Sequence, residues 1–144
     1  MKYLICIQLL FFAVFANAQS KNTRQVLSNT YLLEQTVFGT KDSTTLDNLF
    51  AKLLVYQHSS GRIESREQAI QGIIHNKSLY DIMANLPTAT EVFEREDSLV
   101  TKKVFAATEK KPDGSTSLLN LTIEMVWIKE NKNWKLARRN ATKK

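Results

Sequence analysis

The order of two hydrophobic periodicities along the chain constrains its fold more than any other feature. From Gln25 to about Ile74 apolar residues recur mostly at helical spacing, whereas from Tyr80 onward they recur at the spacing of β-strands. Helices that precede a run of strands joined by short turns are typical of an α+β domain. The sequence therefore predicts three N-terminal helices packed on a curved antiparallel sheet, with a cone-shaped space between the two layers whose open end can hold a ligand.

The first half of the chain predicts three helices. The first spans residues 25–39 and ends at a glycine, which favours helix termination. Asp42 or Ser43 caps the second helix. Ser65 caps the third, and Gln68 completes a capping box. The side chains expected to face the core are Val26, Thr30, Leu33, Val37, Leu46, Leu49, Phe50, Leu53, Ile70, Ile73 and Ile74.

A short β segment, Leu54–His58, precedes the third helix, and five longer strands follow that helix. Lys111–Gly114 and Asn131–Asn133 are turn signals between the last three strands. The longest strand, which ends at Lys129, carries Trp127 on the face that alternating apolar residues mark as the core face. The five strands are expected at residues 80–86, 89–96, 99–108, 117–129 and 134–142, and the apolar residues in phase with the tryptophan are Leu119, Leu121, Ile123 and Met125.

The first 18 residues have the pattern of a secretory signal peptide. Lys2 provides a basic start, Tyr3–Phe15 is an apolar run interrupted only by Gln8, and Ala16–Ala18 is a small-x-small cleavage site. The run is shorter than the ~20 apolar residues that span a bilayer, and a retained anchor is the alternative. We therefore expect cleavage after Ala18, a single domain over residues 19–144, a secreted or periplasmic location, and no membrane attachment after the signal is removed.

Cleavage would also remove Cys6, the only cysteine, so disulfides, thiol catalysis and cysteine metal sites are excluded from the mature domain. The formal net charge of +6 falls to +5 without Lys2. No basic run is interleaved with aromatic residues, so nucleic acid is not an expected partner, and the basic residues are interpreted as a solvated surface. The chain shows no Gly-rich phosphate loop, no nucleophile elbow and no metal-ligand spacing, and we expect no cofactor and no metal.

Several short pieces in order and spacing make the chain resemble a known superfamily. The pieces are Lys41-Asp42, Tyr56–Gly61, Leu79-Tyr80, Val126–Lys129 and Trp134–Leu136 with Asn140 and Thr142. Together they resemble the nuclear transport factor two-like superfamily, the cone-shaped fold shared with ketosteroid isomerase and SnoaL-type polyketide cyclases, and within it the branch called domain of unknown function 4440. The resemblance covers about Val26 to Thr142. It implies the fold but not one function, since similar folds serve enzymes, ligand binders and association domains.

His58 is the first candidate functional residue, because it ends the first β segment, where the cone is expected to open. A neutral imidazole there could accept or donate a proton near pH 7. The alternative is a structural histidine that bonds the Ser59-Ser60 turn and holds its shape. His58 is therefore a candidate ligand contact and a candidate general base.

Arg138 and Asn140 are the second candidates. They lie in phase with Trp134 and Leu136 on the last strand, and members of the superfamily often direct this phase into the cone. An arginine there could hold a carboxylate in two parallel hydrogen bonds. The alternative is the opposite phase, with Arg139 facing inward, because a slip of one residue exchanges the two sets of side chains.

Tyr31, Tyr80 and Trp127 complete the predicted pocket. A phenol directed into the cone could polarise a carbonyl group, although a packed ring with one bonded hydroxyl is the alternative, and Trp127 also fits plain core. An isomerase-like mechanism needs two carboxyl groups in one apolar cavity. The sequence does not place such a pair, since Glu124 has the phase opposite Trp127.

The function expected from these features is the binding of a small, anionic organic molecule in the cone. The first alternative is a cofactor-independent isomerase, dehydratase or hydrolase that uses His58 as general base. The second alternative is an association domain whose cone is filled by side chains. These three possibilities stay open on the sequence.

A homodimer through the outer sheet face is also expected. A sheet with helices on one side is normally polar on the other, yet the outer phase here is partly apolar. The apolar residues of that phase are Leu118, Val126 and Ile128 on the longest strand and Val100, Val104 and Ala106 on the strand before it.

Overall fold

The computed structural model of the protein describes residues 21–83 and 89–144. The predicted signal peptide and its cleavage site lie outside these residues. Helices pack against a seven-stranded sheet whose strand order is β2-β1-β7-β6-β5-β3, with β4 paired to residues 98–102 at the start of β5. Within the described ranges, no helix has the length and apolar character needed to cross a membrane. The α+β cone predicted from the sequence is confirmed.

Helical residues 21–35 form the described part of the N-terminal helix, so the helix includes four residues before the predicted start at Gln25. It continues into a π-helical turn, η1 (Thr36–Thr40), and ends at Lys41, which adopts a left-handed backbone conformation with φ 54°. The predicted end at Gly39 therefore falls inside this turn. The Lys41 ammonium group donates to two carbonyl oxygens that follow the third helix, which fixes the end of the first helix against it.

The caps of the next two helices are confirmed. α2 (Ser43–Leu49) is capped by Asp42, whose carboxylate accepts from the Thr45 N–H at 2.7 Å. α3 (Arg66–His75) has the complete capping box of Ser65 and Gln68. One core prediction is wrong. Leu53 is 85% exposed, because α2 ends at Leu49 and the following residues are already in a strand.

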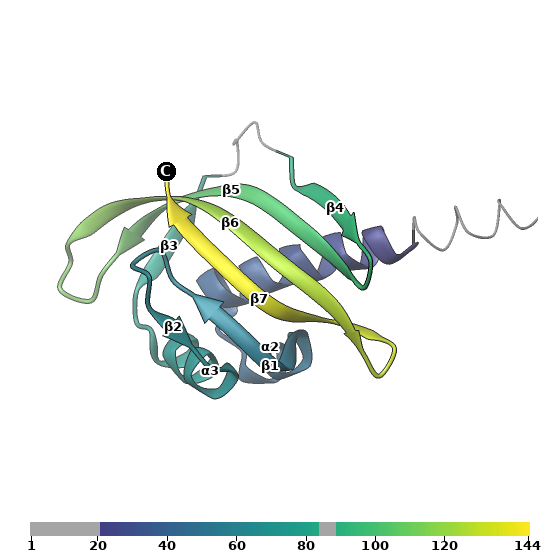
Figure 1. Ribbon diagram of the computed structural model, residues 1–144. Coiled ribbons are helices and arrows are strands. Elements are labelled where there is room, and N and C mark those ends of the chain that lie inside the picture. The colour runs from purple at the N-terminus through teal and green to yellow at the C-terminus, as the bar shows by residue number, and fades with distance from the viewer. Residues whose placement is uncertain (1–20, 84–88) are drawn as a thin grey trace, which may run out of the picture.

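All of the predicted strands are present, and the first is longer than expected. Figure 1 shows β5, β6 and β7 as long curved strands across one side of the N-terminal helix, with α2 and α3 gathered near β1 and β2. The predicted strand at 80–86 is shorter, and its last three residues lie outside the described ranges. The strands are β1 (Phe50–Gln57), β2 (Ile63–Glu64), β3 (Leu79–Ile82), β4 (Glu91–Arg95), β5 (Ser98–Lys110), β6 (Thr116–Glu130) and β7 (Asn133–Lys143).

The sheet is mixed rather than purely antiparallel, since β1 runs parallel to β7 while the remaining pairs are antiparallel. Parallel neighbours need a long connection, and here residues 58–132, about half of the chain, separate β1 from β7. This pairing brings the end of β1, and therefore His58, beside the C-terminal part of β7.

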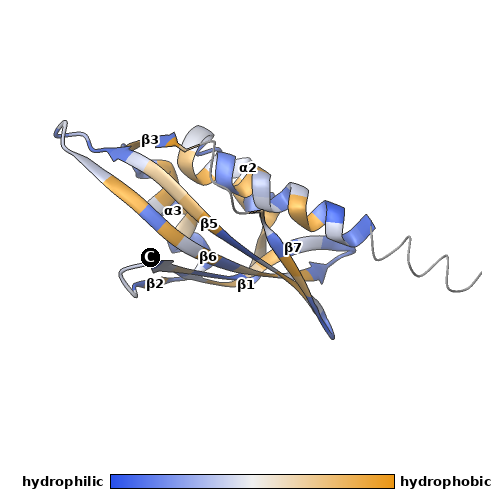
Figure 2. Cartoon of the chain, turned by 90° about the horizontal axis from the view of Figure 1, so that it is seen from above, coloured by the Kyte–Doolittle hydropathy of each residue, from blue (hydrophilic) through white to orange (hydrophobic). Residues whose placement is uncertain are grey.

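The core lies between the inner face of the sheet and the helices. Figure 2 shows apolar residues at intervals along the N-terminal helix and along β5 and β6. The predicted core face of β6 is confirmed: Leu121, Ile123, Met125 and Trp127 are all buried. Trp127 donates its indole N–H to Thr101 on β5 at 3.2 Å, so it is a core residue that also links β6 to β5.

A β-bulge in β7 changes which side chains face the core. Leu136 pairs with Trp127 of β6, whereas Arg138 pairs with Val126, the residue just before Trp127 in the chain. Ala137 is therefore the extra residue in β7. Trp134 and Leu136 face inward before the bulge, and from Arg139 onward the opposite phase faces inward. The bulge therefore places Arg139, not Arg138, on the cone side of the sheet.

Candidate functional site

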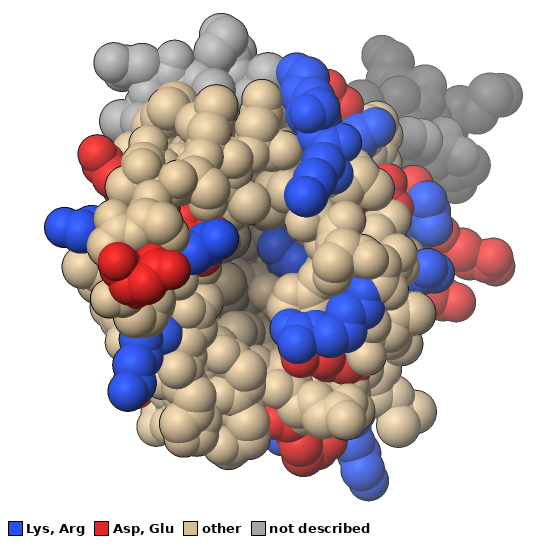
Figure 3. Space-filling model, turned by 90° about the vertical axis from the view of Figure 1, so that its left-hand side faces the viewer, with Lys and Arg blue, Asp and Glu red and all other residues tan. Residues whose placement is uncertain are grey.

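A cavity of about 310 Å³ lies in the cone, between the inner sheet face and the helices. Figure 3 shows a hollow with lysine or arginine side chains around it on the side of the molecule where the cone opens. Its walls come from η1, β1, the β1–β2 turn, α3 and β3, together with β5, β6 and β7. The lining residues are Val37, Phe38, Tyr56, His58, Ser59, Arg62, Glu64, Gly72, Ile73, Asn76, Tyr80, Glu109, Leu119, Leu121, Arg139 and Ala141.

Arg139 supplies a buried positive charge to this cavity. The residue is only 5% exposed. One guanidinium nitrogen donates to the Gln57 carbonyl oxygen at 3.2 Å, and the guanidinium carbon lies 4.6 Å from the centre of the Tyr56 ring. In residues 21–83 and 89–144, no carboxylate forms an ion pair with it. Burial of the Tyr56 phenol raises its pKa, so this residue remains neutral beneath the guanidinium group.

A second cluster forms where the chain turns between β1 and β2. Gly61, with φ 88°, donates to the His58 carbonyl oxygen, and the His58 N–H donates to the Arg62 carbonyl oxygen, both at 2.9 Å. This tight turn brings Glu64 back opposite Tyr56. The Glu64 carboxylate lies 2.7 Å from His58 Nε2 and 3.1 Å from the Arg62 guanidinium group, so Arg62 compensates its charge and His58 lies within hydrogen-bond distance of it.

On the opposite wall, two neutral side chains form a chain of hydrogen bonds that ends at a carboxylate. The Asn76 amide donates to the Tyr80 hydroxyl at 2.9 Å, and that hydroxyl donates to Glu109 Oε1 at 3.3 Å. Ser117 donates to the other carboxylate oxygen at 3.2 Å. Burial raises the pKa of Tyr80 above its ordinary value, and the Glu109 charge acts in the same direction. Tyr80 is therefore a neutral donor at physiological pH.

Solved structures with the same architecture come from several bacteria. An NTF2-like protein from Cytophaga hutchinsonii superposes with a TM-score of 0.69 at 18% identity, over 83% of this chain and 95% of that one. The fold is that of the nuclear transport factor 2-like (NTF2-like) proteins. No protein-family model matches the sequence, and no curated protein matches it either. The finer resemblance to domain of unknown function 4440 therefore remains an inference from the sequence.

The names of NTF2-like neighbours point to different functions. A protein from Streptomyces avermitilis, whose name proposes a dehydratase, superposes with a TM-score of 0.71 at 12% identity, over 87% of this chain and 98% of its own. A protein from Xanthomonas campestris has a name that proposes a calcium/calmodulin-dependent protein kinase II association domain. It superposes with a TM-score of 0.62 at 18% identity, over 81% of this chain and 84% of its own. At these identities the likeness establishes the fold alone.

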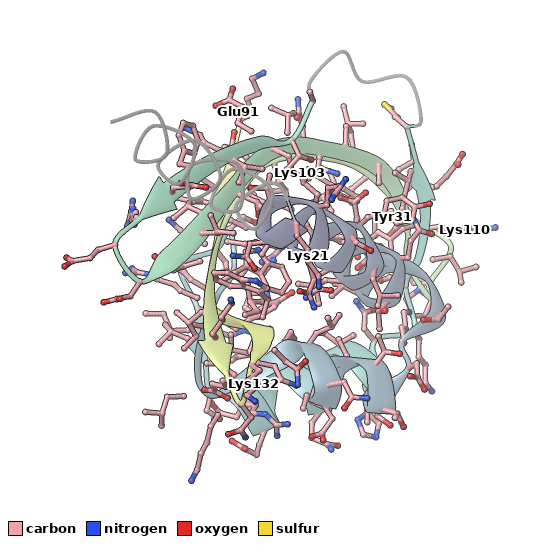
Figure 4. The ribbon with its side chains drawn as sticks, turned by 90° about the vertical axis from the view of Figure 1, so that its right-hand side faces the viewer. Lys21, Tyr31, Glu91, Lys103, Lys110 and Lys132 are labelled. Carbon is pink, nitrogen blue, oxygen red and sulfur yellow. The ribbon has the colours of Figure 1, made fainter. Side chains whose placement is uncertain are left out.

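The NTF2-like cone brings together only part of the predicted pocket. His58 and Tyr80 line the cavity. Tyr31 does not, since it is 64% exposed and projects from the N-terminal helix in Figure 4. Trp127 is completely buried in the core and does not reach the cavity.

The inward placement predicted for Arg138 and Asn140 is wrong. Arg138 is exposed, and both residues lie on the outer face, because the bulge at Ala137 reverses the phase of β7. The Asn140 side-chain oxygen is buried without a hydrogen-bond partner among the described residues. Neither residue faces the cavity.

Four charged lining residues were not among the predicted site residues: Arg62, Glu64, Glu109 and Arg139. A signal existed for Glu109, because it continues the inward phase of Phe105 and Ala107 along β5. The sequence offered an inward-facing Arg139 only as the alternative phase of the last strand. The sequence did not mark Glu64, since its strand has only two residues and is too short to show an alternating pattern. Across the described ranges, no group of three or more potential metal ligands is found.

A larger cavity, about 760 Å³, opens at the other end of the cone, between the β4–β5 turn and the β6–β7 turn. It lies beside Asn22, near the beginning of the described chain. The charged residues in its wall are Glu94, Arg95, Glu96, Asp97 and Lys129, and all of them are exposed. Water already solvates these charges, whereas Arg139 is withdrawn from water, so the smaller cavity is the better candidate site.

Proposed function

We propose that this protein binds a small organic anion in the NTF2-like cavity and that Arg139 is the residue that holds the anionic group. The observation that carries the proposal is Arg139, a residue that is only 5% exposed and whose guanidinium group has no carboxylate partner among the described residues. Transfer of a charge out of water is costly unless the charge is paired. A carboxylate that enters the cavity would supply this missing partner.

The chemistry of Arg139 also suits a carboxylate. A planar guanidinium group can form two parallel hydrogen bonds to a carboxylate, and such charge-assisted bonds are stronger than neutral ones. The contact with the Tyr56 ring and the bond to the Gln57 carbonyl hold the arginine in place before a ligand arrives. Less conformational freedom is then lost on binding. The apolar wall formed by Val37, Phe38 and Ile73 suits a hydrocarbon part of the ligand.

A second candidate function is catalysis by His58. Its Nε2 lies 2.7 Å from Glu64 Oε2 in the wall of the same cavity. If Nε2 carries the proton and donates a hydrogen bond to Glu64, the other ring nitrogen is left as an acceptor and can act as a general base. One NTF2-like neighbour has a name that proposes a dehydratase. Turnover of a bound carboxylate that disappears in His58→Gln, while binding persists, would distinguish an enzyme from a binding protein.

The proposed setting is extracytoplasmic, and it rests on the leader pattern of the first 18 residues. The third possibility, an association domain with a filled cone, is not favoured, since the cavity of about 310 Å³ leaves room for a small molecule.

Exchange of Arg139 for Gln is expected to weaken carboxylate binding by about 1.5–3 kcal/mol, or roughly 10- to 150-fold in Kd, the range for hydrogen bonds to charged groups. A thermal-shift screen of small carboxylates would supply the ligand, and isothermal titration calorimetry would measure the affinity. Arg139→Lys should restore binding only in part, because lysine lacks the planar fork.

Arg138→Gln is the matched control for this experiment, since it removes the same charge from the adjacent position on the outer face. We expect its Kd to equal that of the unmodified protein. Equal losses in both variants would mean that general surface charge drives binding. A screen in which no small carboxylate binds would refute the proposed function.

We also predict a homodimer through the outer sheet face, with a second copy of the chain as the partner. On this face Leu118 is 67% exposed, and Lys102 is aligned with Glu124, so two copies related by a twofold axis can pair opposite charges. The predicted interface needs correction at Val100 and Ala106, which are already buried within one chain.

Light scattering at micromolar concentration measures the molecular mass and so tests this prediction. We expect a mass near twice the ~14 kDa of one mature domain, which has about 126 residues. Leu118→Arg should shift the mass toward the monomer, because it places a charge in an apolar contact. A monomer at all concentrations would contradict the prediction.

A further inference from the structure

The cavity contains a second uncompensated charge, the carboxylate of Glu109. This group is half-buried and accepts hydrogen bonds from the hydroxyls of Tyr80 and Ser117 at 3.3 and 3.2 Å. No lysine, arginine or histidine of the described ranges forms an ion pair with it. Lys41, which lies 6.0 Å from the centre of the Tyr80 ring, donates instead to the carbonyl oxygens of Asn76 and Ser78.

The other carboxylate of the cavity, Glu64, already has partners. Glu64 has an ion pair with Arg62 at 3.1 Å and a contact with His58 at 2.7 Å. Among the residues that the structure describes, the cavity wall therefore contains one cation without an ion pair, Arg139, and one such anion, Glu109. A ligand that carried only a negative charge would pair with Arg139. It would also displace water from the Glu109 carboxylate without providing another partner for that charge, which is unfavourable.

The two unpaired groups are far apart along the sheet. Arg139 is aligned with Met125 of β6, whereas Glu109 is aligned with Ser117. Eight residues separate these positions along the strand, which corresponds to at most about 26 Å of backbone at ~3.3 Å per residue. Curvature of the sheet and the reach of both side chains shorten this span. A molecule with its two charged groups at opposite ends matches two groups that are separated along the sheet better than an α-amino acid, in which both charged groups are attached to one carbon.

The wall between the two charges is largely apolar. Leu119 and Leu121 of β6 lie between the two aligned positions and line the cavity, as does Phe38, whose ring packs against Tyr80 and Phe105. Apolar side chains in this position suit a hydrocarbon linker between two charged ends, because burial of its methylene groups is favourable.

We propose that the ligand is an extended zwitterion, with a carboxylate at one end, an ammonium or similar organic cation at the other and an apolar chain between them. Arg139 holds the carboxylate and Glu109 holds the cation. The carboxylate end of this assignment rests on the proposed function, whereas the cationic end is independent of it. An ammonium group at Glu109 forms charge-assisted hydrogen bonds that the neutral hydroxyls of Tyr80 and Ser117 do not provide.

The test uses ω-amino acids with four-, six- and eight-carbon chains and the unsubstituted fatty acids of the same lengths, measured by isothermal titration calorimetry. At one length we expect the amino acid to bind at least about 10-fold more tightly than the matched fatty acid. Glu109→Gln should remove this preference and leave fatty-acid binding unchanged or improved. Arg139→Gln should weaken both. Glu124→Gln, which removes the same charge from the outer face, is the control and should change neither.

Each outcome separates this inference from the proposed function. Equal binding of amino acids and fatty acids, unaffected by Glu109→Gln, would overturn the zwitterion and leave the carboxylate site standing. Binding of unsubstituted alkylamines as tight as that of the amino acids, together with no effect of Arg139→Gln, would overturn the carboxylate end, and with it the zwitterion and the proposed function, and would leave only a cation site at Glu109. No binding by any member of the series would overturn the zwitterion, while the wider carboxylate screen decides the proposed function. Melting curves of each variant establish that a change in affinity does not come from unfolding.

Discussion

Replacement of Lys103 by methionine is expected to lower the free energy of unfolding by about 3–5 kcal/mol, the range for breaking a buried ion pair from one side. The Lys103 ammonium group donates to Glu34, and the two side chains are only 18% and 8% exposed. Lys103 faces the cone from β5, and Glu34 comes from the N-terminal helix, above which Figure 4 shows Lys103. Loss of the lysine leaves a carboxylate buried without a partner.

The double variant Glu34→Leu, Lys103→Met is the control, and urea unfolding followed by circular dichroism is the measurement. It should recover most of the lost stability, because two apolar side chains of similar volume can replace a buried pair at little net cost. A loss below about 1 kcal/mol in Lys103→Met alone would show that the pair behaves like a solvated surface pair.

This ion pair also bears on the candidate site. Glu34 and Arg139 both line a small space behind the main cavity, with Phe38 between the two regions. Lys103 gives Glu34 a partner of its own, so the Glu34 carboxylate does not compensate Arg139. The positive charge in the cavity therefore remains available to a ligand because a neighbouring acid is already paired.

The elements of the fold were predictable from the sequence because their signals are local. Ser65 and Gln68 specify a helix start within four residues, and alternation along β6 marks Trp127 as core without reference to any other strand. The parallel pairing of β1 with β7 was not predicted, because neither strand contains information about a partner more than 80 residues away in the chain.

The site was less predictable because it depends on one irregular residue. Regular alternation assigns Trp134, Leu136 and Arg138 to one face, and a single extra residue at Ala137 moves Arg138 outward and Arg139 inward. No feature of the strand sequence marks this alanine as a bulge. His58, by contrast, was placed correctly at the cavity, because it directly follows a strand, at the start of a turn that Gly61 marks clearly.

Replacement of Trp127 by alanine is expected to cost about 3–5 kcal/mol of unfolding free energy, the usual range for removing a fully buried aromatic side chain. Trp127 is also the first donor in a chain of three buried hydrogen bonds. Its N–H donates to Thr101 at 3.2 Å, Thr101 donates to Thr30 at 3.2 Å, and Thr30 donates to the Val26 carbonyl oxygen at 2.8 Å. The direction of each bond follows from the last one, since the Thr30 hydroxyl has only one hydrogen.

This chain fastens the N-terminal helix to the sheet, so the position of the helix should respond to its loss. Thr101→Val keeps the shape of the core but leaves the Trp127 N–H without an acceptor, which we expect to cost about 1–3 kcal/mol. Trp127→Phe should cost less than Trp127→Ala, because a ring still fills most of the volume. Hydrogen exchange should show faster exchange in the helix around Thr30 in all three variants. Unchanged protection there, together with a normal melting temperature for Thr101→Val, would show that apolar packing alone holds the helix on the sheet.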